Sequence, residues 1–290
     1  PAITRFLFAD GTELTLDEML NRADGGVIGA QFGSFDGDVL RGSVADDFIE
    51  GFEGNDLINA RGNTDTVFGD DGHDVISAGS GADFVDGGAG DDVIAGGPGA
   101  DVLQGGAGGD VYAFNRGDGA DLVLDDAGVP GSADLDTLSF GHGITPQDIQ
   151  AYVGSSGNLV LLAGGDDSLS IPWFDSANGF AEIEAQRIER AQFFDGPHAR
   201  VFDLSGTVGS LAGALLAADA AHPVSLFTGA TAGFELTGTV AAAGGDPAAG
   251  YAFQCDLFSV GEFVTDGPAD DVVISTPLSD TIDAGDGNNL

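Results

Sequence analysis

Lysine is absent from this 290-residue chain, and other basic residues are scarce. Only 8 Arg stand against 48 Asp and Glu, which gives a formal charge of -40. A surface with so few cations cannot neutralise phosphates, which argues against a nucleic-acid binder and against docking on an anionic membrane. The expected partner for so many carboxylates is a cation.

Cysteine and long apolar runs are also lacking. The single Cys255 excludes an internal disulfide and a cysteine-based zinc cluster. No run of about 18 apolar residues is present, which argues against membrane insertion, and the chain does not open on a basic and apolar signal peptide. A secreted chain without disulfides needs another means of stabilisation, and bound metal can supply it.

Glycine is abundant, with 49 residues, and it belongs to a strict nine-residue repeat. Aspartate recurs every nine residues at Asp38, Asp47, Asp56, Asp65, Asp74, Asp83, Asp92, Asp101 and Asp110. A large apolar or aromatic residue follows each by two positions, at Leu40, Ile49, Ile58, Val67, Ile76, Val85, Ile94, Leu103 and Tyr112. Two positions before each Asp stands a residue that tolerates positive φ, with Ala45 as the exception: Asp36, Gly54, Asn63, Gly72, Gly81, Gly90, Gly99 and Gly108.

Each nonapeptide predicts a six-residue turn followed by a three-residue strand, with Asp at the sixth position and the apolar residue at the eighth. Two nonapeptides would form one coil, and successive coils would pair as parallel strands about 4.8 Å apart. The eighth-position side chains then fill a thin core between two sheets, while the seventh positions face outward. Such a core is too thin to offset the chain entropy unaided.

The sixth-position carboxylates would stack along two edges of this all-β structure. Like charges at that spacing repel unless a cation lies between them, and oxygen ligands with flexible geometry favour Ca²⁺ over Mg²⁺. Seven gaps between neighbouring aspartates on the same edge give about seven ions. Residues 33–126 carry 21 Asp and Glu and 3 Arg, a net charge of -18, which seven divalent ions would reduce to about -4.

The stretch 33–113 resembles the RTX, or haemolysin-type, calcium-binding nonapeptide repeat, G-G-x-G-x-D-x-U-x. The resemblance implies a right-handed parallel β-roll, folding driven by Ca²⁺ and export by a type I secretion machine. It also implies that the nine aspartates are side-chain ligands and that backbone carbonyls of the glycines complete each shell, at Gly72, Gly81, Gly88, Gly90, Gly97, Gly99, Gly106 and Gly108. Ala45 and Ala60-Arg61 depart from the motif, so the sites of Asp38, Asp47 and Asp65 fit it least.

The repeat phase ends at the stretch 112–126, which resembles the closing segment of such rolls and adds Asp118 and Asp121 to the expected ligands. Residues 127–204 are predicted to form a β-rich cap of antiparallel strands over the open end of the roll. Residues 205–265 stay unassigned, as a linker or an inserted subdomain, with a short helix one option for 208–220.

Outside this module the sequence repeats at longer range. Five residues near the start match five at an offset of 185: Ile3, Arg5, Phe8, Asp10 and Gly11 with Ile188, Arg190, Phe193, Asp195 and Gly196. Residues 1–32 are therefore expected to end a preceding cap, and residues 266–290 to begin a second array with Asp271 and Asp280 as ligands. We expect the chain to be part of a longer tandem array.

These features favour an extracellular calcium-binding module with a structural or adhesive role, whose partners besides calcium are neighbouring modules or a cell-surface or matrix component. The alternative is a carrier module of a larger secreted toxin or hydrolase. A third option is a halophilic protein whose acidity serves solubility alone. Neither His-Glu-x-x-His nor Gly-x-Ser-x-Gly occurs, and we expect no enzymatic activity.

Overall fold

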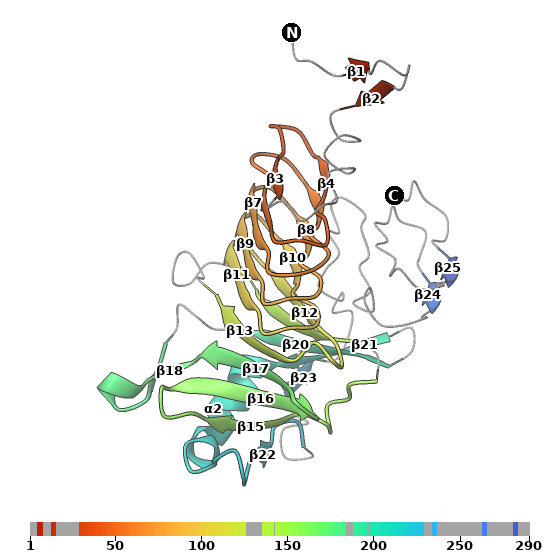
Figure 1. The fold of residues 1–290 in the computed structure, drawn as a ribbon. Coiled ribbons are helices and arrows are strands. Elements are labelled where there is room, and N and C mark those ends of the chain that lie inside the picture. The colour runs from red at the N-terminus through yellow and green to blue at the C-terminus, as the bar shows by residue number, and fades with distance from the viewer. Residues whose placement is uncertain are drawn as a thin grey trace.

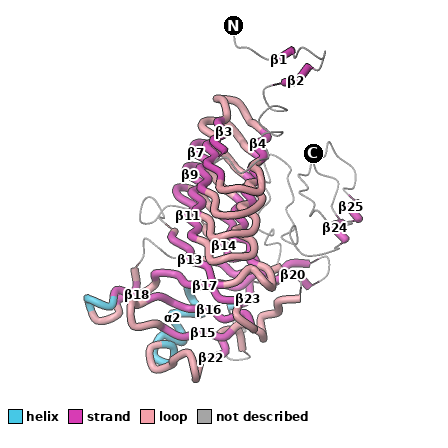
Figure 2. Tube along the Cα trace, viewed as in Figure 1, coloured by secondary structure: helices cyan, strands magenta, loops and turns pink. Residues whose placement is uncertain are grey.

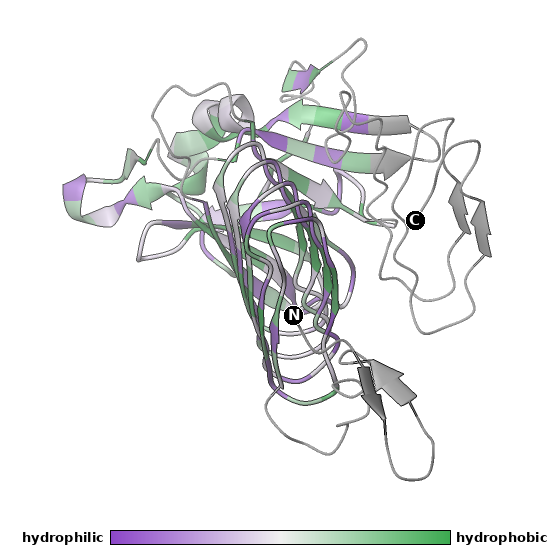
Figure 3. Ribbon diagram, turned by 90° about the horizontal axis from the view of Figure 1, so that it is seen from above, coloured by the Kyte–Doolittle hydropathy of each residue, from purple (hydrophilic) through white to green (hydrophobic). Residues whose placement is uncertain are grey.

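The structure is a computed structural model that describes residues 29–125, 135–141, 143–183, 188–195, 198–228 and 234–236, together with four short strands near the termini. A stack of coils leads into a broader β-rich domain that carries one α-helix (Figure 1). Seen from above, the coils lie over one another as elongated loops (Figure 3). None of the helices in these ranges is long and apolar enough to cross a membrane.

The coils form two parallel sheets that face each other, and each coil gives one strand to each sheet (Figure 2). Sheet 1 contains β4 (Val39–Arg41), β6 (Leu57–Asn59), β8 (Val75–Ser77), β10 (Val93–Ala95) and β12 (Val111–Phe114). Sheet 2 contains β3 (Gly29–Phe32), β5 (Asp47–Glu50), β7 (Thr66–Asp71), β9 (Phe84–Ala89) and β11 (Val102–Ala107). Val93 lies opposite Val75 and Val111, a spacing of 18 residues. The predicted parallel β-roll with two nonapeptides per coil is confirmed.

The core of the roll is a ladder of eighth-position side chains. Each is fully or almost fully buried, and the members are Ile49, Ile58, Val67, Ile76, Val85, Ile94, Leu103 and Tyr112. Leu40, in the first described coil, is only half-buried. Seventh-position residues such as Val75 and Val93 lie on the outer faces and are half-buried. Alternation along each short strand therefore sorts one apolar residue inward and one outward.

The two sheets are less alike than the repeat predicts. Strands β8 and β10 in sheet 1 have three residues, as expected, whereas β7, β9 and β11 in sheet 2 have six. The longer strands continue through the second and third positions of the next repeat, where Asp70, Gly88 and Gly106 lie in register. The uniform six-residue turn was a wrong prediction on this side, because the pairing between neighbouring coils continues through these positions, although Asp70, Gly88 and Gly106 have positive φ.

Beyond the repeats the roll continues instead of ending. β13 (Ala120–Leu124) and β14 (Thr137–Phe140) pair in parallel with β11 and β12, and β17 (Asp167–Pro172) and β20 (Arg190–Asp195) pair in parallel with β13 and β14. The prediction of antiparallel strands in the cap is therefore wrong for β14, whose two described partners are both parallel. It is correct for β15 (Gln150–Val153), β16 (Asn158–Gly164) and β21 (His198–Asp203), and β17 and β20 pair antiparallel with β16 and β21 on their other sides.

Helix α2 (Leu204–Leu215) covers the end of the cap. Asp203 lies at its N-cap, where its carboxylate accepts a hydrogen bond from the Gly206 N–H. Leu204, Val208 and Leu215 are buried in the same hydrophobic core as Trp173. The helix begins at the boundary that the sequence analysis set between the cap and the unassigned segment, so the start of that segment packs with the cap.

Smaller strands complete the two sheets and the cap. β22 (Val224–Ser225) pairs with β15, and β23 (Glu235–Leu236) pairs with β21. β18 (Phe174–Asp175) and β19 (Ala181–Glu182) form a short hairpin around the 3-10 turn η1 (Ser176–Asn178). Stacked aromatic rings join β14 and β20 within one sheet at this end of the core, with Phe140 and Phe193 at a centroid distance of 4.8 Å.

Four terminal strands bear on the longer-range repeat. β1 (Arg5–Leu7) and β2 (Glu13–Thr15) form an antiparallel pair, as do β20 and β21 at an offset of 185 residues. β24 (Phe263–Thr265) and β25 (Thr281–Asp283) pair in parallel with the 18-residue spacing of the roll. The expected neighbouring modules stay predictions, and Asp271 and Asp280 lie outside the described residues.

Candidate metal centre

Sixth-position aspartates line both edges of the roll, as the repeat predicts. From Asp56 onward, Oδ1 accepts a hydrogen bond from the backbone N–H of the aspartate one coil earlier, at 2.7–2.9 Å on the edge that enters sheet 1 and 2.8 Å on the edge that enters sheet 2. Oδ1 of Asp47 is instead buried without a hydrogen-bond partner among the described residues. We call these the first edge (Asp38, Asp56, Asp74, Asp92 and Asp110) and the second edge (Asp47, Asp65, Asp83 and Asp101). Oδ1 of the aspartates from Asp56 to Asp110 therefore holds the coils together without any ion.

The other oxygen, Oδ2, is what makes the edges candidate metal sites. It is buried and accepts no hydrogen bond from the described part of the chain in Asp56, Asp65, Asp74, Asp83, Asp92 and Asp101. These six side chains are at most 2 % exposed. A buried carboxylate oxygen without a donor is costly in free energy unless a proton or a cation neutralises it. Six such atoms in two lines indicate ligands rather than structural acceptors.

Backbone carbonyls lie beside these oxygens because the first position of the repeat is glycine. A Cβ added to Gly69 would lie 2.3 Å from Asp74 Oδ2 and 2.4 Å from the Gly87 carbonyl oxygen. At Gly87 the corresponding oxygens are Asp92 Oδ2 and the Gly105 carbonyl. Glycine therefore leaves room where a carboxylate and a carbonyl of the next coil converge. Carboxylate and carbonyl oxygens are the donors that Ca²⁺ prefers, so the residues present fit that ion.

The glycines whose carbonyls the family resemblance gives as metal ligands share one feature, which is close contact with the preceding coil. A Cβ on Gly90 would lie 1.5 Å from the Gly72 carbonyl oxygen, and one on Gly106 would lie 2.0 Å from that of Gly88. The same contact with the coil 18 residues earlier occurs at Gly72, Gly81, Gly88, Gly97, Gly99 and Gly108. Their carbonyls thus point along the stack, from one coil to the next.

The reason for glycine at the fourth position differs in part from the one predicted. Gly54, Asn63, Gly90 and Gly108 have positive φ, but Gly72, Gly81 and Gly99 do not lie in that region. Lack of space for a Cβ, rather than φ, is what all the glycines share. Positive φ recurs at the second position in every repeat from Phe52 onward, even where the residue is Phe52, Arg61 or Asp70, but it is absent at Ser34 and Ser43.

The first described coil differs from the others. Oδ2 of Asp38 accepts a hydrogen bond from the Ser34 N–H, and Oδ2 of Asp47 accepts one from the Ser43 N–H. These oxygens are satisfied within their own turns. Asp65, although it follows Ala60-Arg61, has the same buried and unpartnered Oδ2 as the regular repeats. The departure from the motif is therefore visible at Asp38 and Asp47 and not at Asp65.

Burial without a cation raises the pKa of these carboxyl groups. Desolvation raises the pKa of Asp65, Asp74 and Asp101 to about 7 and that of Asp92 to about 8, and neighbouring aspartates add to the effect. The backbone hydrogen bond to Oδ1 acts in the other direction, as does nearby His73 at Asp74. Near neutral pH a cation at these edges would therefore compete with protons for the carboxylates.

Of the two aspartates expected from the closing segment, one extends an edge. Asp121 Oδ1 accepts the Asp101 N–H at 3.0 Å and so continues the second edge, although the spacing has grown from 18 to 20 residues. Asp118 instead accepts the Asn115 N–H at 2.7 Å, within its own turn. Burial raises the pKa of Asp121 to about 8 and that of Asp118 to about 6.

Two site residues escaped the sequence analysis. Asp136 continues the first edge, because its Oδ1 accepts the Asp110 N–H at 2.8 Å, and Asp125 lies next to it. Asp136-Thr137-Leu138 repeats the Asp-x-apolar triplet, which was a usable signal. Its distance of 26 residues from Asp110 hid it, since an insertion breaks the nine-residue phase.

Fifth-position side chains form a further row that the sequence did not indicate. Asn55 Oδ1 accepts the His73 N–H at 3.1 Å, His73 Nδ1 accepts the Asp91 N–H at 2.8 Å, and Asp91 Oδ1 accepts the Gly109 N–H at 2.9 Å. The side chains of Asn, His and Asp each accept a hydrogen bond from a backbone N–H of the next coil here. A pattern based on residue identity could not reveal it.

The fold and these edges define the class of protein: a parallel β-roll whose turns present buried oxygen ligands to hard cations. Residues 32–67, 60–94 and 86–121 match the family model of the RTX calcium-binding nonapeptide repeat (4 copies). Residues 32–121 are thus an RTX repeat region, which makes this part of the chain a calcium-binding repeat module. A comparison with the curated proteins found no significant match.

Proposed function

We propose that this chain is an extracellular structural or adhesive module that is exported unfolded and folds when it binds Ca²⁺. The observation that carries the proposal is the line of buried, unpartnered Oδ2 atoms on each edge. Without calcium these carboxylates oppose folding, and with calcium they stabilise the roll. Ligand binding to the folded state alone adds RT ln(1 + [Ca²⁺]/Kd) of stability per site, so calcium concentration decides the state of the chain.

The proposed extracellular location follows from this dependence of folding on calcium. A chain that folds only where Ca²⁺ is abundant stays unfolded in a compartment that keeps Ca²⁺ low, and an unfolded chain can pass a narrow exporter. We propose about seven ions for the main array, one for each gap between neighbouring aspartates on an edge. The parallel pair β24 and β25, with the spacing of the roll, supports a second array in the same chain. A repeated module suits an assembling or adhesive role better than a catalytic one.

The test is far-UV circular dichroism of the 290-residue protein during a Ca²⁺ titration after treatment with EDTA, with Mg²⁺ and NaCl as controls. We expect a cooperative gain of β signal that only Ca²⁺ produces. A full β signal in EDTA, or recovery with NaCl alone, would contradict calcium-driven folding.

A matched pair of variants assigns the effect to the edge. Asp92→Asn removes a buried charge with an unpartnered oxygen, whereas Asp91→Asn removes an exposed charge next to it and keeps the acceptor for the Gly109 N–H. We expect D92N to raise the calcium midpoint severalfold and D91N to leave it nearly unchanged. Equal midpoints for the two variants would show that net charge, not ligation, sets the response.

A further inference from the structure

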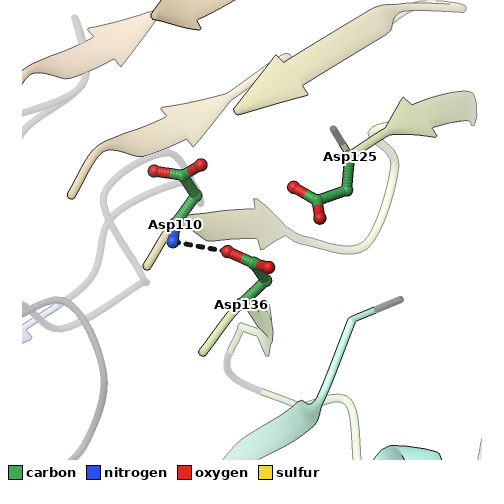
Figure 4. Close-up of side chains that lie close together, drawn as sticks. All are labelled: Asp110, Asp125 and Asp136. Atoms are coloured by element: carbon green, nitrogen blue, oxygen red, sulfur yellow. Dashed lines mark hydrogen bonds between the residues drawn. The ribbon is translucent and has the colours of Figure 1, made fainter. Parts of the chain in front are cut away.

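Three buried carboxylates meet where the roll joins the cap. Asp110 is the sixth-position aspartate of the last repeat and directly precedes β12. Asp125 directly follows β13, and Asp136 directly precedes β14 (Figure 4). They are at most 1 % exposed, and one oxygen of each lies within 4.8 Å of the others. The three come from separate segments, so their meeting is a product of the stacked coils.

The register of the strands shows what is unusual about Asp125. Gln104 lies opposite Leu124, so Asp125 stands one coil beyond Gly105. In the coils before it, the same first position is glycine, at Gly51, Gly69, Gly87 and Gly105. The closing coil therefore places a carboxylate where every earlier coil in this series leaves space.

The neighbouring donors change together with that substitution. A Cβ at Gly87 would meet Asp92 Oδ2 and the Gly105 carbonyl, but one at Gly105 would meet Asp110 Oδ2 and the Tyr112 hydroxyl. That hydroxyl accepts the Gly105 N–H at 2.8 Å and donates to Asp125 Oδ1 at 2.9 Å. Tyr112 thus occupies the place of the missing carbonyl and holds the carboxylate of Asp125 in position.

The second oxygen of Asp125 points into the cluster. Its Oδ2 is buried and accepts no hydrogen bond from outside the cluster within the described part of the chain, and Figure 4 shows the carboxylate turned toward Asp110 and Asp136. The side chains of Asp125 and Asp136 interact with each other. Asp136 is also held by backbone contacts, because its Oδ1 accepts the Asp110 N–H and its N–H donates to Glu189 Oε2 at 3.0 Å.

We propose that Asp110, Asp125 and Asp136 form a separate calcium site that closes the roll and fastens the cap to it. Three carboxylates replace the mixture of carboxylate and carbonyl at the repeat sites, and more charged ligands in a rigid site raise affinity for Ca²⁺. The site shares Asp110 with the first edge but takes its other ligands from outside the repeats. Because Asp136 leads into β14 and contacts Glu189 beside β20, an ion here stabilises the junction between roll and cap.

The test counts the ions bound by the whole protein, by equilibrium dialysis with elemental analysis and by native mass spectrometry. We expect Asp125→Asn to bind one Ca²⁺ fewer than the unaltered protein and to keep the calcium-induced β signal. Asp91→Asn, which removes the same charge from an exposed position, should bind the full number. An unchanged count in D125N would overturn the site.

Terbium, a luminescent substitute for Ca²⁺, gives an independent readout that does not depend on D125N folding well. Tyr112 contacts the site, so excitation of tyrosine should produce terbium emission that saturates with the ion bound there. Tyr112→Phe should lose that component. Emission that is the same in Y112F, or absent from the unaltered protein while calcium still folds the roll, would overturn the site but leave the proposed function intact. Absence of any calcium binding would instead contradict the proposed function.

Discussion

At the scale of single residues, the sixth-position aspartate serves two purposes with its two oxygens. Oδ1 links neighbouring coils through a backbone N–H, as between Asp74 and Asp92, and Oδ2 stays buried without a donor. The hydrogen bond to Oδ1 fixes the orientation of the carboxylate, and this orientation sets the direction in which Oδ2 points. In the folded roll the backbone thus fixes the orientation of each ligand, so an ion that binds to an already folded coil needs no side-chain rearrangement.

A pH dependence follows from these buried carboxyls. Desolvation raises the pKa of Asp92 and Asp121 to about 8 and that of Asp74 to about 7, so without metal the folded roll binds more protons than the unfolded chain. The stability that these protonated groups provide is complete below about pH 4 and is lost as pH rises toward 8. The far-UV circular dichroism signal of the protein in EDTA should therefore be largest near pH 4 and should decline as pH rises toward 8. Calcium should bind more tightly as pH rises, because it competes with protons for the carboxylates. A β signal in EDTA that grows with pH would contradict the account.

Glycine at the fourth position makes a second prediction. In Gly72→Ala the new Cβ would lie 1.6 Å from the Gly54 carbonyl oxygen, so the coils must separate. We expect a loss of about 1–3 kcal/mol in free energy of unfolding with calcium present. Gly213→Ala is the control, since nothing lies within 4 Å and the site is an exposed turn of α2. That variant should be stabilised by about 1 kcal/mol. Equal changes in the free energy of unfolding for the two variants, measured by chemical denaturation, would show that the close spacing of the coils does not require glycine at position 72.

At the scale of elements, the roll depends on very short strands that cannot exist alone. The three residues of β10 place Ile94 inward and leave Val93 on the outer face, and the flanking turns supply the edge ligands. Each strand gains its stability from the coils on either side. The parallel pairing of β17 and β20 with the last strands of the roll extends this stacking into the cap.

The inward ladder can be tested with neighbouring residues. Ile94→Ala empties a fully buried position and should lower the free energy of unfolding by about 2–5 kcal/mol. Val93→Ala, one residue away on the outer face, should cost about 1 kcal/mol. Thermal or urea denaturation in saturating calcium measures both. A larger loss for Val93→Ala would mean that the strand faces the other way.

At the scale of the whole molecule, the roll and the cap share two continuous sheets and one hydrophobic core. The cap strands β17 and β20 each lose one of their two partner strands if β13 and β14 unfold. Unfolding of the roll on calcium removal should therefore destabilise the cap, although few of the proposed ligands lie in the cap.

Trp173 allows this coupling to be measured. It is the only tryptophan of the chain, is 1 % exposed and lies in the cap. We expect its emission to shift to longer wavelength on calcium removal, with the same midpoint as the loss of circular dichroism signal. Separate midpoints would show that the cap folds on its own.

The sequence by itself determined the coil of two nonapeptides, the inward ladder from Ile49 to Tyr112 and the two edges of aspartate. A local period repeated without a slip places equivalent residues one above another in every coil, so the stack follows from it. The tertiary structure alone decided what happens where the period fails. Insertions set Asp121 at 20 and Asp136 at 26 residues from their partners, and the pairing of β13 placed Asp125 opposite Gly105. Such contacts depend on how loops of unequal length close onto a stack, which no spacing along the chain encodes.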